Sequence, residues 1–295
     1  MRAWSAVALC ALLAGGAVAA APAAPAASNP AAVALHRLFH AEWLREMREN
    51  PLEASADGFH QYDGKWPDVS LSTLAREHAE DLQTLASLAV IDRSQLDEED
   101  RISYDLFGYR YRMQVQGYDL KTYLMPMNEL EGIQTLGTLT HTLRFQNVED
   151  YRRYVQRLQT LKPYMDETIA LLQQGVKSGM TEPHVVMQRI PHQIAAYVVS
   201  DPVKSPFYAP FAHMPAIIPP PEQAKLQAEA RKAIAGVVTP AYRELQNYFD
   251  GDYLPHCRRT IAAESLPNGK AYYAYEVRKY TTTDLTPQQI HRMGL

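Results

Sequence analysis

Residues 70–88 read SLSTLAREHAEDLQTLASL, and their pattern is typical of one kind of secondary structure. Ser70 or Ser72 can cap a helix, and leucines then recur at the spacing of helical turns. The stretch therefore predicts a long amphipathic helix with its leucines on one side. Those leucines are Leu71, Leu74, Leu82, Leu85 and Leu88.

Helical signals continue on both sides of this stretch. Upstream, Asn29-Pro30 predicts a helix start and Asn50-Pro51 predicts its end. Downstream, a helix is expected to follow Ser94, with the acids of residues 97–100 in its first turn, where the helix dipole favours negative charge. We expect that acidic run to be solvated, because a calcium loop spreads its oxygen ligands around a glycine turn.

Prolines interrupt the later helical runs. A proline inside a helix lacks an N–H donor and its ring clashes with the preceding turn, so each one should kink or split its helix. Residues 123–140 and 200–221 show no helical period and are expected to form irregular connections. The fold class predicted is all-α, a multi-helix array with proline-kinked helices. The prolines are Pro163 in the run 147–179, Pro191 in 183–199 and Pro240 in 222–253.

The N-terminus indicates export. Residues 1–19 have the basic start, apolar run and small-residue cleavage pattern of a signal peptide, and residues 20–30 are an Ala/Pro-rich tether. Cys10 follows Leu9 where a lipoprotein signal needs a small residue, so lipidation is not expected. The sequence predicts a periplasmic or secreted protein without a membrane anchor after cleavage, whose residues 31–295 form one helical part.

Composition excludes some function classes. A net charge of −4 offers no basic field for nucleic acid. The 18 tyrosines can supply hydroxyl groups to a polar cleft, although amphipathic packing near the surface is their more common use.

Motifs for catalysis are incomplete. His36 and His40 have the spacing of a zinc-binding pair, but the glutamate of an HExxH motif and a third ligand are missing. His184 and His192, each next to a proline, are expected to be exposed. Cys257 has basic neighbours but no partner histidine, which favours a structural thiol. No catalytic residue and no metal ligand is assigned.

Four residues are candidates for a substrate cleft. Asn128 lies in an irregular loop, where either a ligand or turn chemistry explains it. Tyr272 and Tyr273 follow a Pro-Asn-Gly turn and could donate hydrogen bonds to a substrate carbonyl or instead pack in the core. His291 lies on a short final helix that begins at Thr286 and Pro287.

The order of several blocks resembles a bacterial family called "domain of unknown function 885". The resemblance covers about residue 51 to residue 295 and implies an all-α, exported, zinc-metallopeptidase-like protein of the gluzincin type, with roughly twice this length. The blocks are residues 123–128 (YLMPMN), 205–211 (SPFYAPF), 240–242 (PAY), 253–255 (YLP), 269–273 (GKAYY) and 281–295 (TTTDLTPQQIHRMGL).

The resemblance also implies where the chemistry lies. The family's zinc motif, of the form HExxxGHH, follows the last block, at which this sequence stops, so no metal ligand can be assigned to a position here. Zinc is expected only in a full-length member, and this chain is expected to be a truncated or split N-terminal portion that is inactive alone. Asn128, Tyr272, Tyr273 and His291 then become expected cleft-wall residues, with a peptide substrate or a complementary C-terminal half as partner. The alternative is a non-catalytic helical binding or scaffold module with a tyrosine-rich cleft for a peptide or small ligand.

Overall fold

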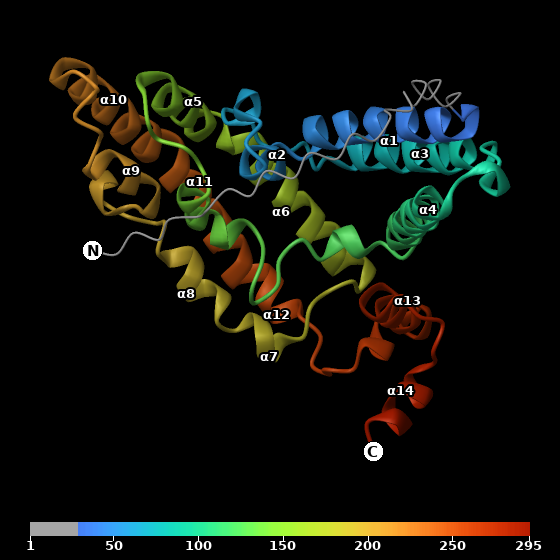
Figure 1. The fold of residues 1–295 in the computed structure, drawn as a ribbon. Helices are drawn as coiled ribbons and strands as arrows, with labels where there is room; N and C mark the ends of the chain where they lie inside the picture. Colours follow the sequence, from blue (N-terminus) through green and yellow to red (C-terminus); the bar gives the residue numbers. More distant parts are fainter. Residues whose placement is uncertain (1–28) are drawn as a thin grey trace, which may run out of the picture.

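The computed structural model describes residues 29–295, which are helical and contain no β-strand beyond one isolated bridge between Pro183 and Arg258 (Figure 1). The all-α prediction is confirmed. The predicted signal peptide at residues 1–19 and residues 20–28 of the predicted tether lie outside the described residues.

The α-helices follow one another through short turns, 3₁₀ segments and two π-helical turns. They are α1 (Pro30–Glu49), α2 (Pro51–Ala56), α3 (Leu71–Ala89), α4 (Glu98–Asp119), α5 (Val148–Gln159), α6 (Leu161–Ser178), α7 (His184–Met187), α8 (Ile190–Ala195), α9 (Ala209–Ala212), α10 (Pro220–Ala233), α11 (Thr239–Tyr248), α12 (Leu254–His256), α13 (Gly269–Thr281) and α14 (Pro287–Met293). The 3₁₀ segments include η3 (Thr122–Leu124) and η4 (Ile133–His141), which occupy the predicted irregular loop.

The helices gather around three hydrophobic clusters. The largest is built by α5, α6, α8 and the α10–α12 run, with Tyr242 and Phe207 fully buried in it. A smaller one joins α1, α3 and α4 around Leu35 and Leu88. The third, around Leu124 and Leu171, draws in Tyr272 of α13 and thereby connects the C-terminal helices to the rest of the fold.

Proline effects are clearest in the run from α10 to α12, which crosses Figure 1 diagonally. A π-helical turn, Ile234–Val238, comes directly before α11 with its Pro240, and a second, Phe249–Tyr253, comes before α12 with its Pro255. The wider turn accommodates a residue that cannot donate to the preceding turn. Helical geometry is therefore interrupted near Pro240, as the sequence predicts, while the run itself continues.

Two other prolines separate helices. The run with Pro163 breaks at Thr160, between α5 and α6, and Pro191 lies in the first turn of α8, after a break from α7. Proline is tolerated in a first helical turn because its missing N–H has no intrahelical partner there. The prediction of kinked or split helices is thus confirmed at these two positions, where the helices are split.

The buried face of α3 differs from the predicted leucine face. Leu71 and Leu82 are 47% and 46% exposed, whereas Thr84 and Leu88 are each 3% exposed. The inward row follows spacings of four, three and four residues through Glu77, Asp81, Thr84 and Leu88, so it is polar over half its length. The predicted leucine side is thus confirmed only in part: Leu74, Leu85 and Leu88 are buried or half-buried, but Leu71 and Leu82 are exposed, and Asp81 is drawn inward by Arg45 of α1.

The acidic first turn of α4 is only partly solvated. Asp97 caps the helix by accepting from the backbone N–H of Asp100 at 2.8 Å. The Asp100 side chain is nearly buried and pairs with His36 Nε2 at 2.6 Å, so the expectation of a fully solvated run is wrong for this residue.

None of the helices between residues 29 and 295 has the length and apolar character that a membrane crossing requires.

Candidate functional site

A buried arginine holds α1 and α3 together at their polar ends. The guanidinium of Arg45 donates to Asp81 Oδ1 at 2.7 Å, to Glu42 Oε2 at 2.8 Å and to Glu49 Oε2 at 3.1 Å. Burial opposes the charge of Arg45, but hydrogen bonds to Asp81 and Glu42 and the charge of Glu49 raise its pKa overall. Arg45 therefore stays cationic and is tied to carboxylates from both helices.

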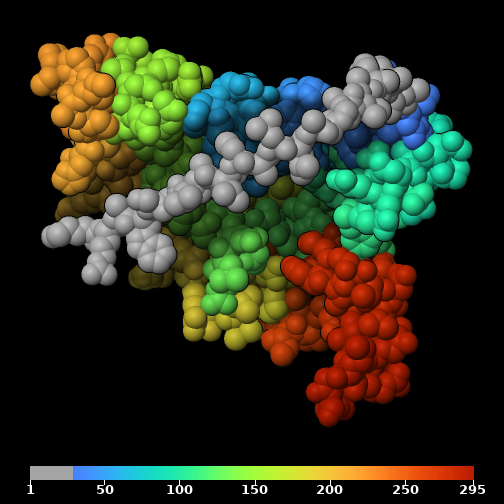
Figure 2. Space-filling model, viewed as in Figure 1, coloured from blue at the N-terminus to red at the C-terminus, as the bar shows by residue number. Residues whose placement is uncertain are grey.

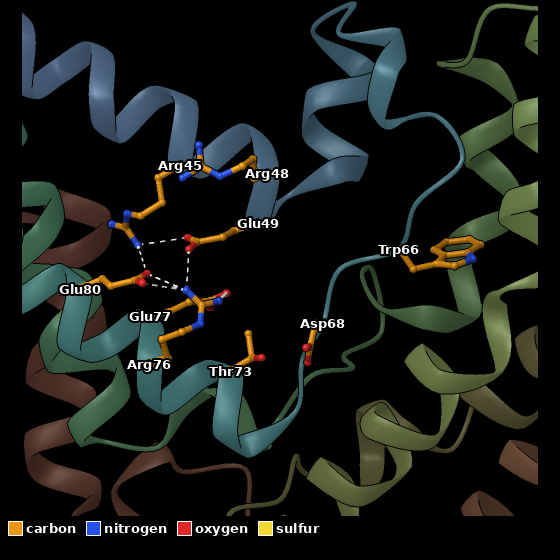
Figure 3. A pocket seen from close by; sticks show the side chains of 9 residues that line it. All are labelled: Arg45, Arg48, Glu49, Trp66, Asp68, Thr73, Arg76, Glu77 and Glu80. Atoms are coloured by element: carbon orange, nitrogen blue, oxygen red, sulfur yellow. Dashed lines mark hydrogen bonds and ion pairs between the residues drawn. The ribbon is translucent and has the colours of Figure 1, made fainter.

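A cavity of about 270 Å³ opens beside this network (Figure 3). Glu49 of α1 and Glu80 of α3 are each contacted by two arginines, Arg45 and Arg76, with Arg76 Nη1 at 2.8 Å from Glu80 Oε2 and at 3.3 Å from Glu49 Oε1. The lining also includes Arg48, Trp66, Asp68, Thr73 and Glu77.

Glu77 differs from the other carboxylates of the cavity. Its nearest cation is Arg76, at 3.6 Å, and it forms no hydrogen bond among residues 29–295. Burial, followed by the charge of Glu49, raises the pKa of Glu77 to about 7. This carboxyl can accordingly take up or release a proton near neutral pH.

The charged cavity does not have the composition of a metal centre. Glu49 and Glu80 are already paired with arginines, which would repel a cation. Across residues 29–295, no three histidine, cysteine, aspartate or glutamate side chains converge as metal ligands would. His36 is engaged by Asp100, and His40 lies beside Trp43 with ring centroids 6.1 Å apart. The geometry supports an ion-pair cavity with one proton-exchanging carboxyl.

The Asn128 side chain stabilises a turn. Its Oδ1 accepts from the backbone N–H groups of Leu130 at 2.8 Å and of Glu131 at 2.9 Å. Its own backbone carbonyl accepts from the side chain of Gln134 at 2.8 Å. Of the two explanations that the sequence left open, turn chemistry accounts for these contacts.

Tyr273 and His291 lie together, and Tyr272 lies apart from them. Tyr273 and His291 line a shallow hollow of about 570 Å³ between α13 and α14. Tyr272 is half-buried against the cluster around Leu124, where burial and nearby carboxylates raise its pKa. The four cleft candidates thus occupy three places rather than one.

Cys257 is a buried thiol. It is 3% exposed, and burial raises its pKa to about 12, with the charge of Glu182 adding to this and Arg258 opposing it. A thiol in this state is a poor nucleophile. The interpretation as a structural cysteine agrees with these surroundings.

The residues that sequence reasoning missed are Arg45 and the carboxylates around it. A signal was present, because α1 carries Leu35, Leu38, Glu42, Arg45 and Glu49 at alternating spacings of three and four. Such a row has the period of a buried seam, yet it changes from apolar to charged partway along. The change is tolerable because Arg45 pairs with carboxylates of its own helix and of α3.

The chain is similar to one protein family and to a solved structure. A family model described as "Bacterial protein of unknown function (DUF885)" matches residues 51–295. A crystal structure described as "the putative lipoprotein from Colwellia psychrerythraea" has a TM-score of 0.77 and 16% sequence identity. The similarity covers 90% of this chain and 48% of that one, so the chain spans about half the length of that neighbour. No curated protein matches significantly.

Proposed function

The chain belongs to the DUF885 family of bacterial proteins, and from this premise we propose that it forms the N-terminal part of an exported zinc-metallopeptidase-like protein. In this proposal, residues 30–295 supply helical support and cleft wall but no zinc ligand. The observation that carries it is the 90% overlap with a neighbour that extends to about twice the length.

Zinc content and peptidase activity test the proposal. Purified residues 20–295 should retain no stoichiometric zinc after dialysis and should show no metal-dependent cleavage of peptide libraries, because a catalytic zinc needs about three protein ligands and an open position. Elemental analysis and a chelator-sensitive peptidase assay provide the measurements. Finding both tight zinc and chelator-sensitive cleavage would overturn the proposal.

Export is part of the same proposal. Its support is the signal-like sequence of residues 1–19, which lies outside the described residues, together with the description of the structural neighbour as a lipoprotein. Because of that neighbour, the expectation that Cys10 carries no lipid stays a prediction.

A second candidate function, a binding module, is favoured by one specific observation. Three tyrosines, Tyr118, Tyr123 and Tyr275, line a pocket of about 350 Å³ where α3, α4 and α13 meet. Ligand binding by the chain without zinc would favour this candidate as a function of its own, whether or not the chain also supports a peptidase.

The C-terminal helices present a surface for a partner. Figure 2 shows the segment of α13 and α14, in red, projecting from the rest of the face in view. Three large apolar side chains on it are exposed, namely Tyr273 at 41%, Tyr280 at 78% and Met293 at 75%. We propose that this surface binds a complementary C-terminal half of the family, since the overlapping neighbour is about twice as long.

Without its partner, this surface should promote association. Purified residues 20–295 are expected to aggregate or self-associate, and the double replacement Tyr280→Lys and Met293→Lys should reduce this by removing apolar contact area. Sedimentation velocity gives the measurement. Val90→Lys, an equally exposed apolar site between α3 and α4, is the control and should change nothing. A monodisperse, cooperatively melting wild-type monomer would contradict this expectation.

A further inference from the structure

The pocket between α3, α4 and α13 has a stacked aromatic wall. The ring of His78 lies on that of Tyr118 with centroids 4.1 Å apart and planes 14° apart, and Tyr118 lies on Tyr123 at 5.2 Å and 28°. These three rings come from α3, α4 and η3. A continuous face of this kind offers apolar contact area to a flat or aliphatic group.

Tyr275 forms another side of the pocket because α4 has a glycine opposite it. A Cβ atom at Gly117 would lie 2.8 Å from the Tyr275 hydroxyl oxygen and 3.3 Å from Thr122 Oγ1. Glycine inside a helix costs about 0.5–1 kcal/mol relative to alanine. The close approach of Tyr275 is the physical reason for a glycine here.

Several polar groups of the pocket are free to bind a ligand. The hydroxyl groups of Tyr118, Tyr123 and Tyr275 take part in no hydrogen bond among residues 29–295. His78 Nδ1 is buried and likewise has no partner in the described part of the chain. Buried polar atoms are nearly always hydrogen-bonded in native proteins, so a ligand or water is expected at such an atom.

Acidic and basic side chains line the pocket from different helices. Glu77 and Asp81 line the pocket from α3, and Lys279 lines it from α13. The Lys279 ammonium lies over the ring of Tyr275, 5.7 Å from its centroid, and is 4.0 Å from Glu276 Oε1. Lys279 is therefore held only loosely, since an ion pair at this distance and exposure contributes little.

We propose that this pocket binds a small zwitterion of amino-acid or dipeptide size. Its ammonium group faces Glu77, its carboxylate faces Lys279, and its apolar side chain lies against the tyrosine rings. The volume of about 350 Å³ is within the range of small-molecule sites. The pocket contains no set of zinc ligands, so the binding proposal and the metallopeptidase proposal can be tested independently of each other.

Glu77 gives the expected binding a pH dependence. The charged groups that act on it are Glu49 and Arg45 of α1 and Arg76 and Asp81 of α3, and burial is the largest influence on its pKa, raising it to about 7. Glu77 thus carries more negative charge at pH 8 than at pH 6. Since the ammonium group needs the carboxylate, affinity should rise between these two pH values.

Calorimetric titration of the purified protein with four probes tests the proposal. L-phenylalanine and alanyl-phenylalanine carry both charges, phenethylamine carries only the ammonium, and 3-phenylpropionate carries only the carboxylate. At pH 7.4, where most of each α-amino group is still charged, at least one zwitterion should bind, and each single-charge probe should bind about tenfold more weakly, the order expected for one charge-assisted hydrogen bond. Equal affinity for a single-charge probe, or no binding of either zwitterion, would overturn the proposal.

Variants assign the two charges. Glu77→Gln and Lys279→Met should each weaken zwitterion binding about tenfold, and Lys279→Met should leave phenethylamine binding unchanged. Lys270→Met is the matched control on α13, because Lys270 is exposed and does not line the pocket. Lys279 is itself exposed, so its variant should fold normally, and circular dichroism verifies this for all three. If Lys279→Met binds the zwitterion with full affinity, Lys279 does not bind the carboxylate of the ligand.

Discussion

Replacing Arg45 with methionine is expected to destabilise the fold by about 3–5 kcal/mol, the usual loss when one partner of a buried ion pair is removed. Arg45 is 9% exposed and forms ion pairs with Glu42, Glu49 and Asp81. The side chains of these three acids are each 14% exposed and are therefore largely desolvated. Methionine fills part of the space but leaves those carboxylates without their cation. Urea unfolding at pH 7.5 measures the loss.

The pH dependence of that loss follows from the sign of the carboxylate shifts. Burial already raises the pKa values of Glu49 and Asp81, and removing the cation raises them further. A carboxyl with a raised folded-state pKa gives no penalty below its unfolded pKa and a growing penalty as pH rises. The deficit of Arg45→Met should therefore be smallest near pH 4 and largest above neutrality.

Arg76→Met is the matched control for Arg45. Arg76 contacts Glu49 and Glu80, as Arg45 does, but its side chain is 50% exposed. Exposed ion pairs contribute about 0–1 kcal/mol, so the loss should be at most about 1 kcal/mol. Equal losses for the two variants would show that burial does not distinguish these arginines.

A second large effect is expected for Arg157→Met, about 2–4 kcal/mol, because methionine leaves the buried acceptors of this fully buried arginine without a donor, at about 1–3 kcal/mol each. Its Nη2 donates to the carbonyl of Tyr62 at 2.8 Å and to Ser55 Oγ at 2.9 Å, and its guanidinium carbon lies 5.6 Å from the ring centroid of Trp66. These contacts fasten the segment after α1 to α5. Burial also lowers the pKa of Arg157 to about 10, so the guanidinium still carries its proton at neutral pH and can donate these hydrogen bonds.

Hydrogen exchange locates the consequence of Arg157→Met. Residues 51–66 should exchange faster in the variant, because their anchor to α5 is gone, while α10 and α11 keep their protection. Arg152→Met is the control on the same helix, since Arg152 is about half exposed and pairs only at 3.4 Å with Glu222. Unchanged exchange at residues 51–66 would mean that other contacts hold the segment.

Much of the secondary structure follows from local signals in the sequence. Asn29 caps α1 by accepting from Ala31 N–H at 3.0 Å, and Thr286 with Pro287 starts α14 through a capping box with Gln289. The family was also predictable, because short blocks such as residues 205–211 occur in a specific order, and the match over residues 51–295 confirms it. The metallopeptidase character remains a proposal.

The candidate sites were predictable only in part. The family resemblance implied one cleft for Asn128, Tyr272, Tyr273 and His291, and the structure puts only Tyr273 and His291 around one hollow. It could not place Tyr275 against Gly117, because that contact joins α13 to α4 across more than half of the chain. A glycine within a helix signals a close approach but does not name the approaching group.

The sequence alone determined that this chain is all-α, where several helices begin and where prolines interrupt them, because caps, periods and proline geometry act within a few residues. Tertiary structure alone decided which side of α3 is buried. An apolar stripe favours burial, and Leu74, Leu85 and Leu88 are buried or half-buried, but Arg45 of α1 also draws the carboxylate of Asp81 inward while Leu71 and Leu82 stay exposed. Electrostatic partners from distant segments can thus outweigh the local hydrophobic pattern, and they meet only when the chain has folded.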